Sequence, residues 1–382
     1  MAEAPVEALA GVPLGRKPEP GTALCLSGGG YRAMVFHIGA LWRLYEADLL
    51  GKIKRISSVS GGSITAGLLG VKWRELSFQP ANLENDFVPK VVEPLRRMAG
   101  ETIDAEAFIL GHLLPGSVSD RIAGAYERNL FQGATLQDLP DEPRFVINAT
   151  NVQSAALWRF MKPYMRDYRV GEIKNPTIPL SQAVAASSAF PPVLSPLELR
   201  LDPDKFTAKS GLDLQRDPFT SRVILTDGGV YDNLGLETAW KRYQTILVSD
   251  GGGKTQPEEE PHKDALRHSY RVLDLVDNQV RSLRKRQLID SFKADESDAV
   301  HRSGAYWGIR TDIKDYQLGD ALECPWQRTL VLAQTPTRLQ RMDDNLQERL
   351  INWGYAVCDA ALRKHVDANI KKGSFPYPAV GV

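Results

Sequence analysis

Short apolar runs that end in glycine or serine turns alternate with longer segments of helical spacing in the first part of the chain. The runs at 22–26 and 53–59 predict β-strands, and a helical pattern over 32–47 lies between them. A second helix is predicted to begin at Gly62 or Ser63. This alternation is typical of α/β proteins whose central sheet is mostly parallel, and that is the fold class we predict.

The same two patterns continue along the chain. Apolar runs predict further strands, one of them a hairpin partner of its neighbour, at 144–151, 155–160, 222–226, 245–250 and 307–309. Helical spacing predicts helices at 180–188, 266–292 and 337–370, and residues 77–135 are expected to be mainly helical. The polar stretch 202–220, which is rich in turn-forming residues, is expected to be a loop.

Breaks in the pattern divide the chain into three parts. Residues 1–21 carry several prolines and scattered glycines and predict an irregular N-terminal arm. A charged stretch with prolines, 253–261, follows the last strand of the α/β pattern and is the best internal break. We therefore expect a core over 22–250 and a mainly helical extension over 251–382 that packs on the same domain.

Composition argues against several classes of protein. The 47 Lys and Arg residues balance 47 Asp and Glu residues, which argues against a nucleic-acid polymer as partner. No apolar run approaches the ~20 residues that span a bilayer, so contact with a membrane is expected only at its surface. The N-terminus lacks a signal-peptide pattern and the three cysteines form no CxxC pair, so we expect free thiols and a cytoplasmic location.

Three glycines, Gly28 to Gly30, stand between the first predicted strand and the first predicted helix. One interpretation is a dinucleotide-binding turn, but that turn requires an acidic residue about 20 positions further on. Serines occupy that place, at 57, 58 and 60. The other interpretation is an oxyanion hole, in which glycines let successive backbone N–H groups point at one spot beside a helix N-terminus.

Ser60 follows the second predicted strand in the sequence Ser58-Val59-Ser60-Gly61-Gly62. A nucleophile elbow has the pattern G-x-S-x-G, because its strained turn leaves room only for small residues beside the serine. Ser58 replaces the first glycine and is itself small. The alternative is that Ser60 or Ser63 only caps the next helix.

Asp227 ends a predicted strand and is followed by two glycines. The carboxyl ends of parallel strands place side chains toward a ligand, and the glycines permit close approach. Asp227 is therefore a candidate base for Ser60, although an Asp-Gly pair is also common in ordinary turns.

Taken in order, a glycine loop, an S-x-S-x-G elbow about thirty residues later and a D-G-G sequence resemble the patatin-like phospholipases. Three further stretches are similar to that family, namely 146–151, 185–192 and 350–355. The resemblance covers 22–250 well and the remainder loosely. Ser58 and Ala33 depart from the commonest pattern, since each replaces a glycine.

The resemblance implies a three-layer α/β/α fold and a lipid acyl hydrolase of phospholipase A or lysophospholipase type. Ser60 would be the nucleophile and Asp227 the base, backbone N–H groups of Gly28, Gly29 and Gly30 would hold the oxyanion, and Arg32 would orient that loop. The reaction would pass through an acyl-enzyme on a phospholipid or lysophospholipid at a membrane surface, on its inner face, and would need no metal or other cofactor. Gating by a small molecule or protein activator and a homo-oligomeric state are left open.

Other interpretations of the sequence have less support from its residues. A Ser–Asp–His triad would need His262 or His268, which no glycine-flanked signature accompanies. A lipid- or nucleotide-binding module without hydrolysis, with a phosphate at Gly28–Ala33, is the alternative function. The basic run at 281–286 is interpreted as a solvated helix face, and the alternative is a patch that binds lipid headgroups. No sequence pattern of a metal site is present.

Overall fold

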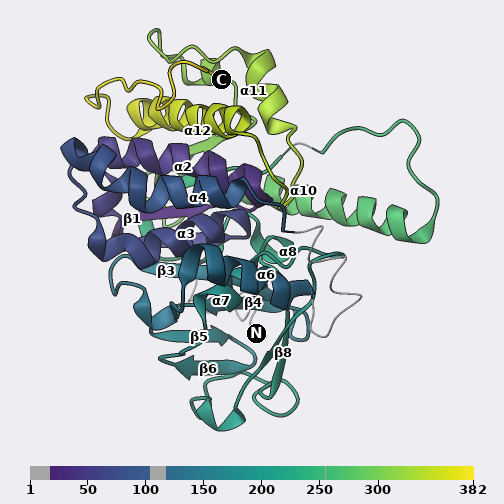
Figure 1. Cartoon of the computed structure of the whole chain (residues 1–382). Helices are drawn as coiled ribbons and strands as arrows, with labels where there is room; N and C mark the ends of the chain where they lie inside the picture. The colour runs from purple at the N-terminus through teal and green to yellow at the C-terminus, as the bar shows by residue number, and fades with distance from the viewer. Residues whose placement is uncertain (1–17, 104–117, 254) are drawn as a thin grey trace.

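A computed structural model of the chain describes residues 18–103, 118–253 and 255–382 (Figure 1). Its described strands are β1 (Glu19–Leu26), β2 (Arg55–Val59), β3 (Arg144–Asn151), β4 (Ala156–Phe160), β5 (Tyr164–Asp167), β6 (Gly171–Lys174), β7 (Leu197–Arg200), β8 (Arg222–Asp227), β9 (Tyr243–Asp250) and β10 (Ser303–Gly308). Its described α-helices are α2 (Gly30–Glu46), α3 (Gly61–Lys72), α4 (Glu93–Ala99), α6 (Val118–Tyr126), α7 (Leu180–Ser187), α8 (Gly229–Asp232), α9 (Glu237–Trp240), α10 (Ala265–Lys293), α11 (Trp326–Ala333) and α12 (Asp344–His365).

One sheet joins all of these strands. Its centre, in the order β10-β9-β1-β2-β3, is parallel throughout. Beyond β3 the sheet turns antiparallel, through β4, β5 and β6 on one side and through β8 and β7 on the other. With helices on both faces of the parallel centre, the predicted α/β class is confirmed. Residues 1–17 of the predicted arm (1–21) lie outside the described residues, as do 104–117 of the predicted helical stretch. The end of the arm is not irregular, because β1 already begins at Glu19 and pairs with β9.

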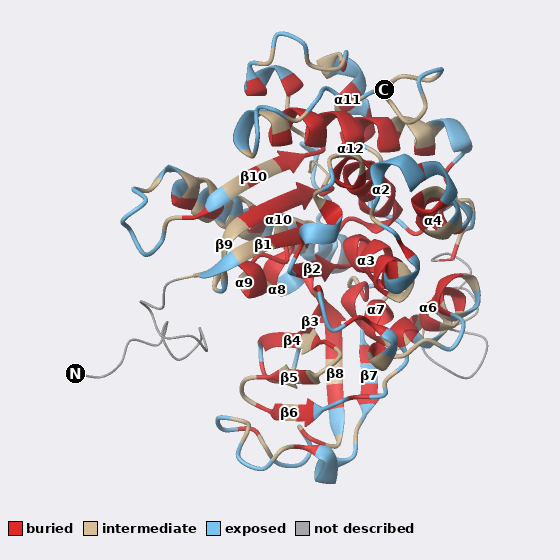
Figure 2. Cartoon of the chain, turned by 90° about the vertical axis from the view of Figure 1, so that its left-hand side faces the viewer, coloured by how far each residue is buried: buried red, intermediate tan, exposed pale blue. Residues whose placement is uncertain are grey.

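Strand β1 shows how the sequence builds three layers. Its side chains alternate between two hydrophobic cores, because neighbouring residues of a strand point to opposite faces. Leu24 and Leu26 pack in the larger core with α2, α3 and α12. Ala23 and Cys25 pack in the smaller core, on the face that α9 and α10 cover (Figure 2). Both faces of the strand are therefore buried, and the run reads as continuously apolar.

Helix α2 lies at the centre of the larger core and is buried along almost its whole length. Helix α12 packs directly on it, and two glycines allow the approach. A Cβ atom at Gly39 would overlap the carbonyl oxygen of Ile351, and one at Gly354 would overlap that of Phe36. Nearby, the buried guanidinium of Arg43 pairs with Asp359 at 2.8 Å. The last part of the chain is thus built into the same core as the first strand and helix.

Replacing Gly39 by alanine tests this close packing. The added methyl group must push α2 and α12 apart, and overpacking of this kind costs about 2–3 kcal/mol. We expect a lower urea midpoint with an unchanged secondary-structure content by circular dichroism. Gly319→Ala is the matched control, since nothing lies within 4 Å of a Cβ there. Equal midpoints for the two variants would contradict the packing.

Two predictions made from the sequence need correction here. The helix predicted over 337–370 is confined to α12, whose first N–H groups Asp343 caps by accepting from Leu346 N at 2.8 Å. The basic run 281–286 is a solvated face only in part, because Lys285 and Arg286 are exposed whereas Arg281 is buried and pairs with Asp277 at 3.1 Å. Arg284 pairs with Glu237 at 3.0 Å. Helical spacing locates charges on a helix but not the neighbour that covers them.

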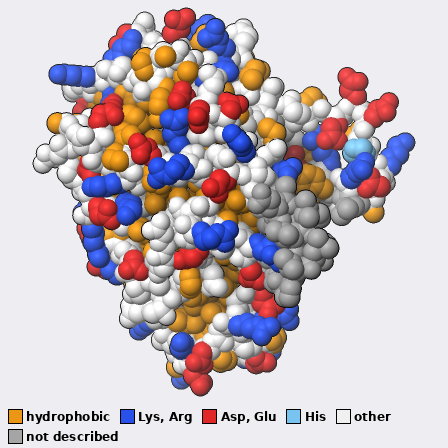
Figure 3. Space-filling view, in the orientation of Figure 1, with side chains coloured by type: hydrophobic (Ala, Val, Ile, Leu, Met, Phe, Trp, Pro, Cys, Tyr) orange, Lys and Arg blue, Asp and Glu red, His pale blue; other side chains and the backbone are white. Residues whose placement is uncertain are grey.

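The surface of the molecule carries both kinds of charge. Over the face in Figure 3, acidic and basic side chains are interspersed.

Candidate active site

Ser60 lies at a sharp turn between β2 and α3. Its φ of 52° and ψ of −122° form a strained conformation for a residue with a side chain, and such strain concentrates at functional sites. The residues after it must be glycines. A Cβ at Gly61 would overlap the carbonyl oxygen of Gly30, and one at Gly62 would overlap that of Leu26. The turn is therefore wedged against the end of β1.

Neither alternative role as a helix cap fits this turn. The Ser60 side chain makes no capping hydrogen bond to α3. Ser63 instead donates from its hydroxyl to Ser58 Oγ at 3.0 Å, and Ser58 donates to the carbonyl oxygen of Val146 at 3.3 Å. The serine that replaces the first elbow glycine is thus accommodated, because its hydroxyl has partners on both sides.

Ser187, at the end of α7, holds the backbone of the elbow. Its hydroxyl accepts from Ser60 N–H at 2.9 Å and donates to the carbonyl oxygen of Asn148 at 2.7 Å. It also lies 2.9 Å from Ser63 Oγ. Sequence reasoning gave Ser187 no role, although it belongs to the stretch 185–192 that resembles the family. The sequence pattern around Ser187 could be recognised, but its contact with Ser60 could not, because the two residues are 127 positions apart.

Asp227 reaches Ser60 by a route that the sequence argument did not foresee. Strand β8 is antiparallel to β3, so Asp227 is not at the end of a parallel strand. Along β3, Asn148 pairs with Val59 of β2 and the next residue, Ala149, pairs with Asp227 of β8. Strand β4 occupies the other edge of β3 at both residues. Strands β2 and β8 therefore meet end to end on one edge, and their carboxyl ends bring Ser60 and Asp227 together.

The carboxyl group of Asp227 is buried and hydrogen-bonded on both of its functional sides. It accepts from the Ser60 hydroxyl, and its Oδ1 accepts from Gly229 N–H at 2.7 Å. Burial raises the pKa of Asp227 to about 7, against the lowering effect of these two hydrogen bonds. The negative charge of Asp277 on α10 adds to the rise. A carboxyl group with this pKa can exchange a proton near neutral pH.

The glycine loop presents backbone N–H groups at the N-terminus of α2. Gly29 has a φ of 144° and Gly30 a φ of 59°, both of which favour glycine. Among the described residues, no acceptor takes a hydrogen bond from the N–H of either one. The N–H of Gly28, in contrast, donates to the carbonyl oxygen of Asn233 at 3.1 Å. Of the three expected donors, the N–H groups of Gly29 and Gly30 therefore have no hydrogen-bond acceptor among the described residues, and the N–H of Gly28 already has one.

Two buried side chains behind the loop hold its position. His37 lies 3.0 Å from the carbonyl oxygen of Ser27 and 2.8 Å from Ser249 Oγ. Burial lowers the pKa of His37 to about 4, so the ring is neutral at physiological pH. Arg32 donates to the carbonyl oxygens of Gly251, at 3.0 Å, and of Thr335. Burial also lowers the pKa of Arg32. The bonds of Arg32 tie the start of α2 to the segment that follows β9 and to the segment that follows α11.

The histidine and metal alternatives find no support in the described part of the chain. No histidine there hydrogen-bonds to Ser60 or Asp227, and His262 and His268 contact each other on the exposed side of α10. Likewise, no group of three or more His, Cys, Asp or Glu side chains is placed to hold a metal ion in the described residues. Within the same residues, no helix combines the length and the apolar character that a membrane span requires.

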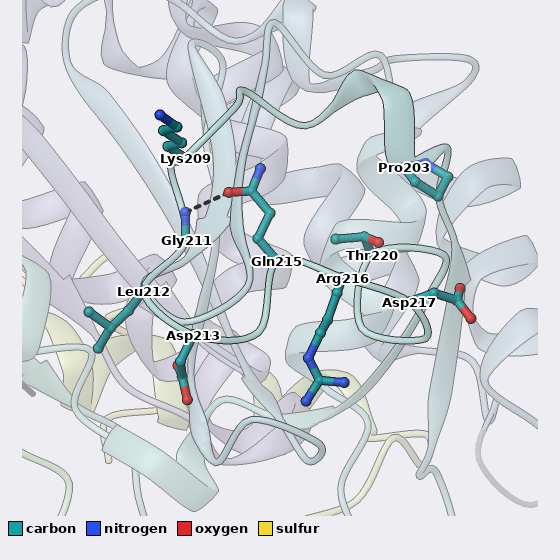
Figure 4. A pocket seen from close by; sticks show the side chains of 9 residues that line it. All are labelled: Pro203, Lys209, Gly211, Leu212, Asp213, Gln215, Arg216, Asp217 and Thr220. Atoms are coloured by element: carbon teal, nitrogen blue, oxygen red, sulfur yellow. Dashed lines mark hydrogen bonds between the residues drawn. The ribbon is translucent and has the colours of Figure 1, made fainter.

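A surface cavity of about 750 Å³ lies elsewhere, in the loop that precedes β8 (Figure 4). Lys209, Asp213, Arg216 and Asp217 line it, and Gln215 accepts from Gly211 N–H at 3.0 Å. Strand β8 separates this loop from Asp227 by five residues, or roughly 16 Å at 3.3 Å per residue. The cavity is thus no part of the serine site.

Comparison with known proteins agrees with this geometry. The sequence matches the family described as patatin-like phospholipase over residues 24–240, which is more than half of the chain. A comparison with curated proteins finds no match. A solved structure of human GIVD cytosolic phospholipase A2 superposes with a TM-score of 0.52 and 14% identity, covering 92% of this chain and 62% of that one.

A second structure of the human enzyme, in complex with methyl gamma-linolenyl fluorophosphonate, has a TM-score of 0.53 and 17% identity, covering 89% of this chain and 57% of that one. The chain thus spans about three fifths of the length of these proteins. At such identities the superpositions show a shared fold, and the sequence match shows the family. This chain belongs to the patatin-like phospholipase family.

Proposed function

We propose that this protein hydrolyses carboxylic esters of phospholipids or lysophospholipids at a membrane surface, with Ser60 and Asp227 as catalytic dyad. Membership of the family supports a lipid hydrolase. The observation that carries the finer proposal is the strained Ser60, hydrogen-bonded to a buried carboxyl group of raised pKa. A nucleophile, its base and nearby unpaired N–H groups form a minimal set for acyl transfer.

The chemistry follows from these positions. Ionised Asp227 takes the hydroxyl proton as Ser60 Oγ attacks the ester carbonyl carbon. The N–H groups of Gly29 and Gly30 stabilise the oxyanion of the tetrahedral intermediate. As the intermediate collapses, the bond to the alcohol breaks and the alcohol leaves with the proton from Asp227. Water then attacks the acyl-enzyme while Asp227 takes a proton from it. As this second intermediate collapses, Ser60 Oγ leaves with the proton from Asp227 and the fatty acid is released.

The direct test has two measurements on the wild type. An alkyl fluorophosphonate probe should label Ser60, which peptide mass spectrometry would locate. Phosphatidylcholine vesicles should release free fatty acid and lysophospholipid, measured by lipid mass spectrometry. Labelling at Ser60 together with fatty acid release supports the proposal. A folded protein that neither labels nor releases product would instead be a binding module.

Ser187→Ala tests the support of the elbow. The change leaves Ser60 N–H and the Asn148 carbonyl without their partner, so the nucleophile can shift, and a shift of 1 Å can cost about a hundredfold in rate. We expect kcat to fall by about ten- to a hundredfold with KM within threefold. Ser188→Ala is the matched control, since Ser188 donates only away from the elbow, to the carbonyl oxygen of Val184 at 2.7 Å. A loss of stability without a change in kcat would assign Ser187 a structural role alone.

A further inference from the structure

Asn233 lies where the glycine loop, the dyad and helix α10 meet. It follows the last residue of α8, and only 7% of its surface is exposed. Its backbone oxygen accepts the N–H of Gly28 at 3.1 Å, so its main chain supports the glycine loop. The dyad of Ser60 and Asp227 leaves the side-chain amide of Asn233 without a role.

The direction of this amide is fixed by Asp277, on α10. The amide nitrogen Nδ2 donates to Asp277 Oδ1 at 3.1 Å, with Oδ2 at 3.4 Å. Burial raises the pKa of Asp277, and the ion pair with Arg281 at 3.1 Å opposes that rise. An ionised carboxylate can only accept hydrogen bonds, so the nitrogen must face Asp277 and the oxygen Oδ1 must face away from it.

The amide of Asn233 lies beside both members of the dyad. Two glycines show this, because the points where a Cβ atom would stand on them have neighbours on either side. The point at Gly28 is 3.1 Å from Asn233 Oδ1 and 3.1 Å from Ser60 Cβ. The point at Gly229 is 2.8 Å from Asn233 Nδ2 and 2.9 Å from Asp227 Oδ1. The oxygen of the amide is therefore on the side of the nucleophile.

Asn233 Oδ1 is buried and accepts a hydrogen bond from no described residue. A buried polar atom without a partner is costly and rare in folded proteins, so it points to a partner that arrives from outside. That partner must bring a donor hydrogen. The ester groups of a diacyl phospholipid offer only acceptor oxygens, whereas a water molecule offers two O–H donors.

The two halves of the proposed reaction bring different oxygens to this place. Asp227 gives a proton to the leaving alcohol and later takes one from the attacking water, so both oxygens must come within its reach. In the first half that position holds an ester oxygen, which has no hydrogen for Asn233 Oδ1. In the second half it holds water, which has one hydrogen for Asp227 and one for Asn233.

We propose that Asn233 Oδ1 holds the water molecule that hydrolyses the acyl-enzyme. This inference rests on the proposed function, because it assigns a residue to the second half of that reaction. With its hydrogens directed at Asn233 and Asp227, the water turns a lone pair toward the acyl carbonyl carbon. The new bond from oxygen to carbon forms as Asp227 takes one proton. The bond from that carbon to Ser60 Oγ then breaks as the same proton passes to Oγ.

Asn233 gains and loses no proton in these steps. Its oxygen accepts a hydrogen bond throughout, and it contacts the reacting water directly. Asp277 is a positioning residue, since it acts only by holding the amide in this direction.

Asn233→Leu removes both polar amide atoms and keeps the backbone bond to Gly28. With p-nitrophenyl butyrate, stopped-flow release of p-nitrophenol measures acylation, and mass spectrometry of quenched protein measures the acyl group on Ser60. At pH 8 we expect acylation within about threefold of the wild type and deacylation at least about tenfold slower, because a misplaced nucleophile costs that much. Acylated Ser60 should therefore accumulate. Asn82→Leu, an exposed position before α4, is the control and should match the wild type in both steps.

Two variants of Asp277 test the anchor, and they decide the matter should Asn233→Leu fail to fold. An asparagine at 277 can still accept from Asn233 Nδ2, whereas a leucine cannot. We expect Asp277→Leu to slow deacylation by about tenfold with acylation little changed. Asp277→Asn should bring deacylation back to within about threefold of the wild type. Both are measured at pH 8, above the pKa of about 7 of Asp227.

The outcomes separate this inference from the proposed function. A folded wild type that forms no acyl group on Ser60 would overturn both. A wild type that forms one, together with unchanged deacylation in Asn233→Leu, would overturn the inference alone. Equal slowing of the two steps would do the same, since it indicates a structural defect. A raised KM for lysophosphatidylcholine with unchanged deacylation would also overturn it, because Oδ1 would then bind a substrate hydroxyl.

Discussion

Ser60→Ala is expected to reduce kcat for ester hydrolysis by at least about a thousandfold, while the protein stays folded. The change removes the atom that would form the acyl-enzyme and leaves the backbone strain of the elbow in place. The hydrogen bond from Ser60 N–H to Ser187 also remains, since it uses the main chain. Vesicle assays with lipid mass spectrometry and labelling with a fluorophosphonate should both lose their signal.

The control for this variant is Ser221→Ala, a half-buried loop serine before β8 that should keep full activity. Thermal unfolding of the two variants within about 2 °C of the wild type would show that the loss is chemical. Wild-type turnover by a folded Ser60→Ala would remove Ser60 from the mechanism and the dyad with it.

Asp227→Asn should reduce kcat about as strongly as Ser60→Ala does. It should also change how the free energy of unfolding depends on pH. In the proposed mechanism Asp227 accepts a proton and must therefore be ionised, and its pKa is raised to about 7. The wild-type kcat/KM is therefore expected to rise with pH and reach half of its plateau near pH 7. An amide cannot accept the proton, so the variant should be inactive at every pH.

The sign of the stability effect follows from the direction of the pKa shift. In the unfolded chain an aspartate ionises near its usual 3.8, and in the folded protein only near 7. A group with a raised folded pKa favours the folded state below the unfolded value, and that contribution is lost as pH rises through the folded one. Ionising the buried Asp227 thus costs stability, on the order of 4 kcal/mol at pH 8.

Asp227→Asn carries no such cost. The variant should be more stable than the wild type at pH 8, and the difference should shrink toward zero at pH 4. Urea unfolding at pH 4, 6 and 8 measures it, and Asp204→Asn, an exposed position before β8, is the control. A difference that grows on acidification would show that Asp227 is a structural carboxylate whose ionised form is stabilised by folding.

Several elements could be predicted from the sequence because their cause is local. The alternation in β1 follows from a strand with both faces buried, and the apolar spacing of α2 from a buried helix. The glycines beside Ser60 were recognisable because they belong to a short elbow pattern. The atoms that exclude a Cβ there, the carbonyl oxygens of Gly30 and Leu26, are nevertheless more than thirty residues away and only the fold brings them close.

Other features depended on chain segments that are distant in sequence. The sequence placed Asp227 at a strand end but predicted the wrong direction of pairing, because strand direction depends on the connections and not on the strand. Ser187, Asn233 and the burial of Arg281 likewise involve contacts between distant elements. The raised pKa of Asp227 also depends on distant segments, because it follows from the nearly complete burial that the fold gives this side chain.

The sequence by itself determined the chemical groups of the site: a serine that can attack, a carboxyl group that can take its proton, and glycines that can present N–H groups. Their residue types are fixed by chemistry, and the small residues beside them form short sequence patterns that can be recognised without the fold. The tertiary structure alone decided that these groups meet, because β2 and β8 end against each other on one edge of β3. It also decided which N–H groups stay open, since the partner of Gly28 lies about two hundred residues further along the chain.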